Sequence, residues 1–265
     1  MPADTANVQD PRNTSSGEPI LELRKVRKSF GGVRALDGVD LVLYSDEVLA
    51  VVGDNGAGKT TLIKTISGAH RPDSGEIYFQ GKKVEIRNPR AAREIGIETV
   101  YQDLALVNTL DVVENLFLGR FLKRFRFFVN RKEMIVRTKD ILQRLNINIP
   151  FIREPVQNMS GGQRQSLALG RAVAWGGKVV ILDEPTAALG VKEKNKVLTL
   201  IRQLKEHNVS VIVISHNMRD VFDVSDRIVV LRGGRVVASR MKNETNMEEI
   251  VMLITGAIES MGVDM

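Results

Sequence analysis

The sequence of 265 residues contains no cysteine, which excludes disulfide bonds and catalysis by a thiolate. It also lacks long apolar runs: Val179–Leu182 is among the longest, and a membrane-spanning helix needs roughly 20 such residues. The N-terminus has neither the basic start nor the apolar core of a secretory signal, so we expect the protein in the cytoplasm. Any membrane path that it serves would then lie in another chain.

The net charge is +6, but no zinc-ligand spacing and no RNA-binding aromatic signature accompanies it. A basic excess can attract nucleic acid or an anionic membrane surface. A mixed, solvated surface is the simpler interpretation, because hydrophobic residues (43%) and charged residues (26%) are at levels ordinary for a globular protein. We therefore expect no nucleic-acid partner.

The chain divides into a polar start and one long remainder. Residues 1–17 are rich in Ser, Asn, Asp and Pro, which predicts a disordered N-terminal tail. Residues 18–265 are enough for one sizeable core, and we expect a single domain there. Helical patterns dominate the middle of this domain and predict an inserted helical subdomain over about 103–168.

Strand patterns flank the predicted helical insertion on both sides. Apolar runs at 179–182 and 209–214 are typical of central parallel strands, and the run at 47–52 is consistent with a buried strand. Segments 76–86 and 227–239 each place glycine between two strand patterns and predict antiparallel hairpins. The alternation of strands and helices predicts an α/β fold with a mainly parallel sheet, an antiparallel β subdomain and inserted helices.

One stretch matches the G-x-x-x-x-G-K-[ST] phosphate loop in full. It follows a predicted strand and opens a predicted helix, which distinguishes it from a chance glycine-rich turn. Backbone N–H groups of such a loop converge on an anion, Lys59 adds positive charge, Thr60 can ligate Mg²⁺, and Thr61 can add a phosphate contact. The matching residues are Gly53, Asp54, Asn55, Gly56, Ala57, Gly58, Lys59 and Thr60.

Two adjacent carboxylates, Asp183 and Glu184, follow the apolar run at 179–182. Ligands of open α/β sheets bind at the carboxyl ends of the strands, and adjacent strand residues point to opposite sides. We therefore expect Asp183 to face Mg²⁺ and Glu184 to face the attacking water, the two needs of phosphoryl transfer. Without other motifs, two carboxylates at this position would most simply be a solvated strand end. The phosphate loop in the same chain favours the catalytic interpretation.

Together with Ser160-Gly161-Gly162-Gln163, these motifs resemble the ATP-binding cassette (ABC) family over about residues 20–239. Ser160 is typical of a helix N-cap, and the two glycines expose backbone N–H groups at the helix start, which predicts a second phosphate-binding surface. The alternative is a helix cap without a ligand-binding role. The resemblance implies an ABC ATPase with a P-loop NTPase core. It also implies that Ser160–Gln163 contacts the ATP held by a second copy of the chain, in a head-to-tail dimer.

The resemblance implies roles for three further residues. Gln102 is similar to the glutamine that meets Mg²⁺, His216 to the histidine that supports the γ-phosphate, and Phe30 to the aromatic that stacks on adenine. A surface amide, a structural histidine and a core phenylalanine are the respective alternatives. Gly190 departs from the family pattern, because most members carry aspartate there, in the loop that crosses the dimer interface.

The segments Asn158–Gln165 and Glu184–Val191 resemble the carbohydrate-import branch of this family, which includes ATPases for fructose, ribose and xylose. The single phosphate loop is similar to the single-cassette fructose importers. The resemblance implies a peripheral protein on the inner face of the cell membrane that energises monosaccharide uptake. Its partners would be integral membrane permease subunits and, indirectly, a periplasmic sugar-binding protein. A soluble non-transport ABC ATPase and a regulatory nucleotide-binding module are the alternatives.

Residues 120–128 form the densest basic and aromatic cluster of the sequence. Three interpretations are open: stacking on nucleic acid, contact with a membrane partner or lipid headgroups, and an amphipathic helix or loop with its phenylalanines packed inward. We expect the third of these.

Overall fold

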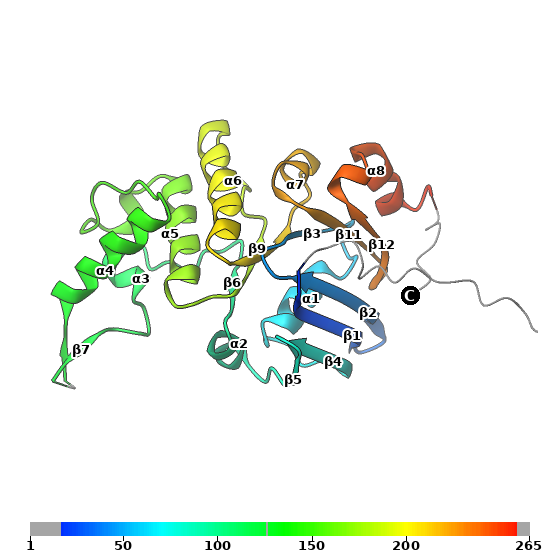
Figure 1. Ribbon diagram of the computed structural model, residues 1–265, viewed down its shortest axis with the longest axis horizontal. Coiled ribbons are helices and arrows are strands. Elements are labelled where there is room, and N and C mark those ends of the chain that lie inside the picture. Colours follow the sequence, from blue (N-terminus) through cyan, green and yellow to red (C-terminus); the bar gives the residue numbers. More distant parts are fainter. Residues whose placement is uncertain (1–16, 126, 259–265) are drawn as a thin grey trace, which may run out of the picture.

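The computed structural model describes residues 17–125 and 127–258, so the predicted tail lies outside the described residues except for Gly17. The molecule is elongated, with two large sheets at one end and a group of helices at the other (Figure 1). Among the described residues, no helix has both the length and the apolar character required to cross a membrane.

The first sheet is antiparallel and contains the hairpin predicted over 76–86. Leu21 and Leu23 of the first strand and Leu41 and Leu43 of the second are buried, because alternate side chains of these long strands face the core. In spatial order the strands are β2 (Val33–Tyr44), β1 (Pro19–Phe30), β4 (Ser74–Phe79) and β5 (Lys82–Val84).

The second sheet has six strands and is parallel except for one edge strand. All residues of its two central strands are buried, which explains why these runs are apolar without alternation. The hairpin predicted over 227–239 forms its antiparallel edge. In spatial order the strands are β12 (Arg235–Met241), β11 (Arg227–Arg232), β3 (Val48–Val52), β10 (Ser210–Ile214), β9 (Val179–Asp183) and β6 (Ile97–Val100).

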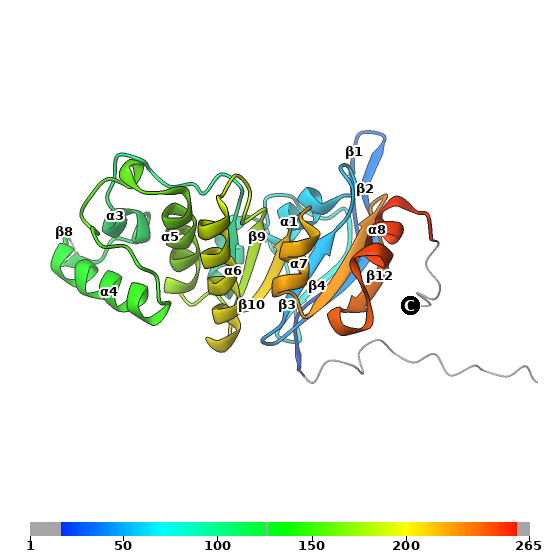
Figure 2. The same ribbon diagram turned by 90° about the horizontal axis from the view of Figure 1, so that it is seen from above.

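Helices cover the six-stranded sheet on one face, and the antiparallel sheet with one helix covers the other. Figure 2 shows α5 (Gly161–Ala174), α6 (Val191–Glu206), α7 (Met218–Val224) and α8 (Met247–Thr255) in a row. On the opposite face, α1 (Lys59–Ile66) packs between the two sheets, and α2 (Pro89–Ile95) lies near it. Both faces of the parallel strands are thus shielded from water.

The chain between β6 and β9 contains the far helical end of the molecule. Its α3 (Val112–Leu116) begins with a capping box of Asp111 and Glu114, and α4 (Arg131–Arg144) is capped by Asn130. Phe117 packs edge-on against Trp175 with ring centroids 5.1 Å apart. Short 3-10 turns occupy Val156–Asn158 and Lys242–Glu244.

The prediction for residues 120–128 is wrong about the phenylalanines. This segment contains a hairpin of two short strands, β7 (Lys123–Arg124) and β8 (Phe128–Val129), instead of an amphipathic helix. The side chains of Phe125, Phe127 and Phe128 are 76%, 84% and 71% exposed. They do not pack inward because the hairpin extends beyond the helices that would have to cover it (Figure 1).

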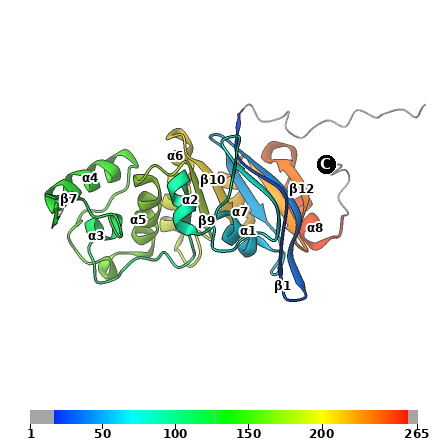
Figure 3. The same ribbon diagram turned by 90° about the horizontal axis from the view of Figure 1, so that it is seen from below.

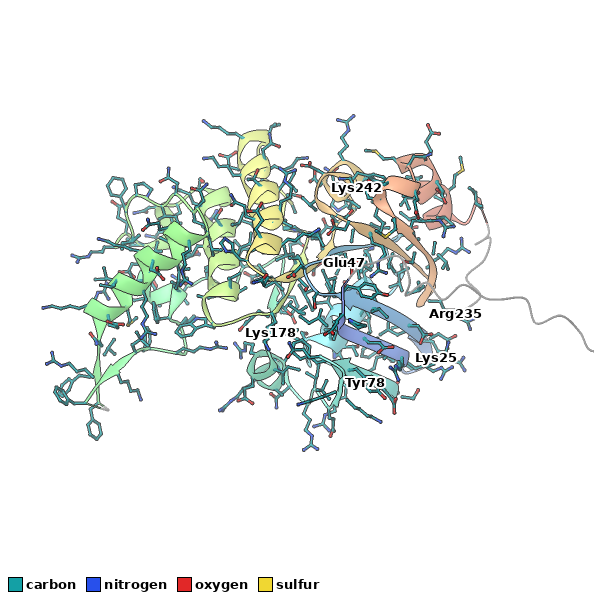
Figure 4. All side chains as sticks on the ribbon, in the orientation of Figure 1. Lys25, Glu47, Tyr78, Lys178, Arg235 and Lys242 are labelled. Carbon is teal, nitrogen blue, oxygen red and sulfur yellow. The ribbon has the colours of Figure 1, made fainter. Side chains whose placement is uncertain are left out.

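A buried ion pair joins the two large sheets. Glu47 lies in the turn between β2 of one sheet and β3 of the other (Figure 4), and its carboxylate accepts two hydrogen bonds from Arg227 at 2.7 and 2.9 Å. The same guanidinium donates to the carbonyl of Val42 at 2.6 Å, and Tyr44 donates its N–H to Glu47 at 2.9 Å. Both charges are therefore removed from water and hydrogen-bonded.

Breaking this pair leaves an unpaired buried charge, so Arg227→Met is expected to lower the free energy of unfolding by about 3–5 kcal/mol. Urea denaturation followed by circular dichroism measures the change. The control is Arg144→Met, because Arg144 and its partner Asp140 are 65% and 59% exposed. That variant is expected to lose less than about 1 kcal/mol. Equal losses in both would contradict the structural importance of the buried pair.

Candidate functional site

The phosphate loop joins the end of β3 to the start of α1, and two of its glycines cannot be replaced without collision. Gly53 has a φ of 155°, and a Cβ there would lie 2.2 Å from the carbonyl oxygen of Leu231. Gly58 has a φ of 107°, and its Cβ would lie 2.5 Å from the carbonyl oxygen of Ala35. The neighbouring backbones therefore fix the curled shape of the loop and require glycine at both positions.

Lys59 folds back over the loop that precedes it. Its ammonium donates hydrogen bonds to the carbonyl oxygens of Gly53 at 2.7 Å and Asp54 at 2.9 Å. Burial lowers the pKa of Lys59, and the negative charges of Glu184, Asp54 and Asp183 oppose this effect. The positive charge is thus held at the loop, within electrostatic range of the two carboxylates predicted to be catalytic.

The parallel register brings the predicted site residues to one edge of the sheet. Ile214 at the end of β10 pairs with Val51 in β3 on one side and with Asp183 in β9 on the other. The phosphate loop after β3, the carboxylates at the end of β9 and the segment after β10 are therefore neighbours. Burial, together with the nearby Glu184, raises the pKa of Asp183, and Lys59 opposes the rise.

Glu184 is held in place by the segment that follows β10. Its backbone has a φ of 51°, and its N–H donates to the carbonyl of Ile214 at 2.8 Å. Its carboxylate accepts hydrogen bonds from the backbone N–H of His216 at 3.1 Å and from the hydroxyl of Ser215 at 3.4 Å. The Nδ1 atom of His216 lies 2.8 Å from the same carboxylate. Glu184 and His216, which were predicted separately as site residues, are therefore in direct contact.

The Ser160–Gln163 segment is the capped start of α5. The hydroxyl of Ser160 accepts the N–H of Gln163 at 3.3 Å, and the side chain of Gln163 accepts the N–H of Ser160 at 3.0 Å. A Cβ on Gly162 would lie 2.7 Å from Glu193, so glycine allows α5 and α6 to approach closely. No hydrogen bond of the described residues joins this segment to the phosphate loop. The helices that these two segments begin lie on opposite faces of the sheet, with α5 on one and α1 on the other.

Gln102 lies at the same edge of the parallel sheet, whereas Phe30 belongs to the antiparallel sheet. Gln102 follows β6, whose Val100 pairs with Leu182, and it lines a hollow of about 330 Å³ together with Gly161. Phe30 ends β1 and is 45% exposed, so it is not a core residue. Its ring packs edge-on against His70 with centroids 5.0 Å apart.

Sequence reasoning missed the residues that support the loop after Glu184. Thr186 in this loop donates its hydroxyl to the buried carboxylate of Asp220 in α7 at 2.7 Å. The ammonium of Lys194 in α6 also contacts Asp220 at 2.7 Å, and Gly190 forms the N-cap of α6. Ser215 was missed as well, although a polar residue at the end of an apolar strand next to His216 is a usable signal. Asp220 gives no such signal, because only the tertiary fold brings it to Thr186.

Comparison with known proteins agrees with this geometry. A family model described as ABC transporter matches residues 36–187. The xylose/arabinose import ATP-binding protein XylG of Sulfolobus acidocaldarius is 50% identical over 236 residues, covering 89% of this chain and 94% of that protein. The fructose import ATP-binding protein FrcA of Rhizobium meliloti is 47% identical over 250 residues, covering 91% of this chain and 96% of that protein.

A solved structure is similar over most of its length. It is an ATP-binding cassette in a dimeric post-hydrolysis state bound to ADP and Pi, with a TM-score of 0.71 and 26% sequence identity. The match covers 84% of this chain and 98% of that one. The predicted fold class and family are confirmed: the chain is an ATP-binding cassette ATPase and belongs to the ABC transporter family.

Proposed function

We propose that this protein hydrolyses Mg·ATP to energise the uptake of a monosaccharide, such as fructose, ribose or xylose, through separate permease subunits. The meeting of Lys59, Asp183 and the Glu184–His216 pair at one sheet edge carries the catalytic part of this proposal. The relatives named for import of xylose/arabinose and fructose support the sugar class. The choice among these sugars would belong to the permease and to a periplasmic binding protein.

The donor set at the sheet edge fits Mg²⁺. This ion prefers oxygen ligands and takes one or two carboxylates from protein, with phosphates and water completing the shell. Asp183, Thr60 and Gln102 supply a carboxylate, a hydroxyl and an amide oxygen. No group of three or more acidic or histidine residues that could hold a metal occurs in the described part of the chain. When bound, the ion would neutralise phosphate charge.

Phosphate binding is assigned to the loop residues Gly53–Thr61, with the Lys59 ammonium as the main positive charge. Glu184 would orient or deprotonate the attacking water, and the contact with His216 holds its carboxylate in one direction. His216 would then support the γ-phosphate with its exposed ring. Phe30, exposed at the end of β1, offers a face for adenine.

A second copy of the chain would complete the site. Ser160–Gln163 begins α5 on one face of the sheet, whereas the phosphate loop leads into α1 on the other face, and no hydrogen bond of the described residues joins the two segments. A head-to-tail dimer would place the segment of one copy over the ATP of the other. The similar cassette that is dimeric and bound to ADP and Pi supports dimerisation.

A hollow of about 300 Å³ between the sheet and the helical end suits a permease segment. Glu98 and Arg171 line it, and burial raises the pKa of Glu98 and lowers that of Arg171. Arg171 is fixed by hydrogen bonds to the carbonyls of Leu104 and Ala105 at 2.8 and 2.9 Å. With a permease segment in this hollow, the protein would be peripheral on the inner face of the membrane.

The proposed domain division is one domain over residues 18–265, with a helical subdomain over about 103–168.

Lys59→Ala is expected to weaken ATP binding by at least about tenfold, because the loop loses its fixed positive charge. Isothermal titration calorimetry with ATP measures the dissociation constant. The control is Lys82→Ala in the exposed strand β5, which removes the same charge elsewhere. Unchanged affinity in Lys59→Ala would reject the phosphate-binding role.

Glu184→Gln is expected to keep ATP binding and to lower kcat by about 100-fold or more, because an amide cannot accept the proton of water. Phosphate release measures turnover, and fluorescent-nucleotide titration measures binding. The control is Glu206→Gln at the exposed end of α6. Turnover of Glu184→Gln near that of the unchanged protein would remove Glu184 from the mechanism.

The Glu184→Gln variant also tests the dimer. Light scattering is expected to give a mass of 29.4 kDa without nucleotide and twice that mass with Mg·ATP. Slow hydrolysis should preserve the closed state long enough to measure it. A mass that stays monomeric while ATP is bound would contradict dimerisation of the isolated chain.

A further inference from the structure

The β7–β8 hairpin concentrates aromatic and basic residues. Five of the nine phenylalanines of the chain fall within residues 117–128. Residues 115–132 contain six arginines and lysines and no aspartate or glutamate. One of these, Arg126, lies outside the described residues. Such a local composition is unusual in a chain in which aromatic residues make up 5%.

The base of the hairpin is anchored to the helical end. Phe117, just before it, is 1% exposed and packs on Trp175. Leu122 packs against the core, and its carbonyl accepts the N–H of Asn130 at 2.7 Å. The hairpin is therefore held at a fixed place, although only two residue pairs form its ladder.

No described residue forms a covering layer over the tip of the hairpin. Phe125, Phe127 and Phe128 are 76%, 84% and 71% exposed, and Val129 is 55% exposed. The N–H of Phe127 donates to the carbonyl of Phe125 at 2.8 Å, which makes the turn tight. Large apolar side chains gathered on one exposed projection mark a contact surface.

Among the described residues, two cations near the tip differ in their ion pairs from Arg120 and Arg131 at the base. Arg120 pairs with Glu98, and Arg131 pairs with Asp111 and Glu114. Lys123 and Arg124 make no ion pair with any described residue. Arg124 lies 5.1 Å from the ring centroid of Phe125, so charge and ring are adjacent.

The geometry points to an anionic lipid surface as the partner, and we propose that the β7–β8 hairpin is a membrane wedge. Its phenylalanines would enter the boundary between headgroups and acyl chains, while Lys123 and Arg124 contact lipid phosphates. A soft lipid surface accepts a narrow projecting tip, whereas stacking on nucleic acid needs a groove that follows the strand. This inference goes beyond the proposed function and does not depend on ATP hydrolysis.

The position of the hairpin agrees with this role. Arg120, three residues before β7, also lines the hollow assigned to the permease. Ala92 and Arg93 of α2 border the same hollow. The hairpin and α2 both lie on the lower side of the molecule in Figure 1, and Figure 3 views the molecule from that side. A membrane that holds the permease on this side would therefore meet the tip.

Sedimentation of the full chain with vesicles tests the proposal. We expect binding to vesicles of phosphatidylglycerol and phosphatidylcholine, and at least roughly tenfold weaker binding to pure phosphatidylcholine. Phe127→Ser/Phe128→Ser and Lys123→Gln/Arg124→Gln should each weaken binding to the anionic vesicles by roughly tenfold or more. ATP turnover in solution should stay unchanged in both variants.

Matched controls keep the test specific. Phe151→Ser removes a phenylalanine that is 65% exposed elsewhere on the helical end, and Arg144→Gln/Arg153→Gln removes two exposed cations. Neither should change vesicle binding by more than about twofold. Equal loss in the controls would overturn the proposal. So would the absence of vesicle binding, or single-stranded RNA that binds the hairpin and displaces the vesicles.

Discussion

The parallel pairing of β3, β10 and β9 is the constraint on which the rest of the structure depends. Parallel strands must be covered on both faces, so these runs are buried and their ends all point to one edge. The phosphate loop, the Asp183–Glu184 pair and His216 all follow these strand ends, so the strand pairing alone brings them to the same edge. The Glu47–Arg227 pair then fixes the antiparallel sheet to it, and α1 fills the space between them. The geometry of the candidate site therefore follows from strand register.

Much of the fold and the catalytic edge could be predicted from sequence because their signals are local. Gly53 and Gly58 carry positive φ angles that the loop motif already requires, and Asp183 ends an apolar run whose length predicts a buried strand. Ser160 forms the N-cap that its residue type predicts. In each case the residues of one short segment are enough to predict its local structure.

The remaining features depend on which segments meet in space. The contact of Thr186 with Asp220 joins residues 34 positions apart, and no pattern in either segment indicates it. The aromatic hairpin was expected to pack inward because phenylalanines usually do, but packing needs a neighbouring layer, and the sequence does not show whether one exists. The packing of α5 and α1 on opposite faces of the sheet depends on the tertiary fold for the same reason.

Helix α5 also has a mechanical consequence. Its 14 residues begin beside Ser160 and end at Trp175, which borders the hollow between sheet and helical end. At 1.5 Å per residue the helix is a rod of about 21 Å, and its hydrogen-bonded backbone resists bending. A tilt of about ten degrees about the Trp175 end would move Ser160 by roughly 3–4 Å, more than the length of a hydrogen bond. Because the helix is rigid, any change in its tilt at the Trp175 end appears at Ser160 as a displacement large enough to make or break a hydrogen bond.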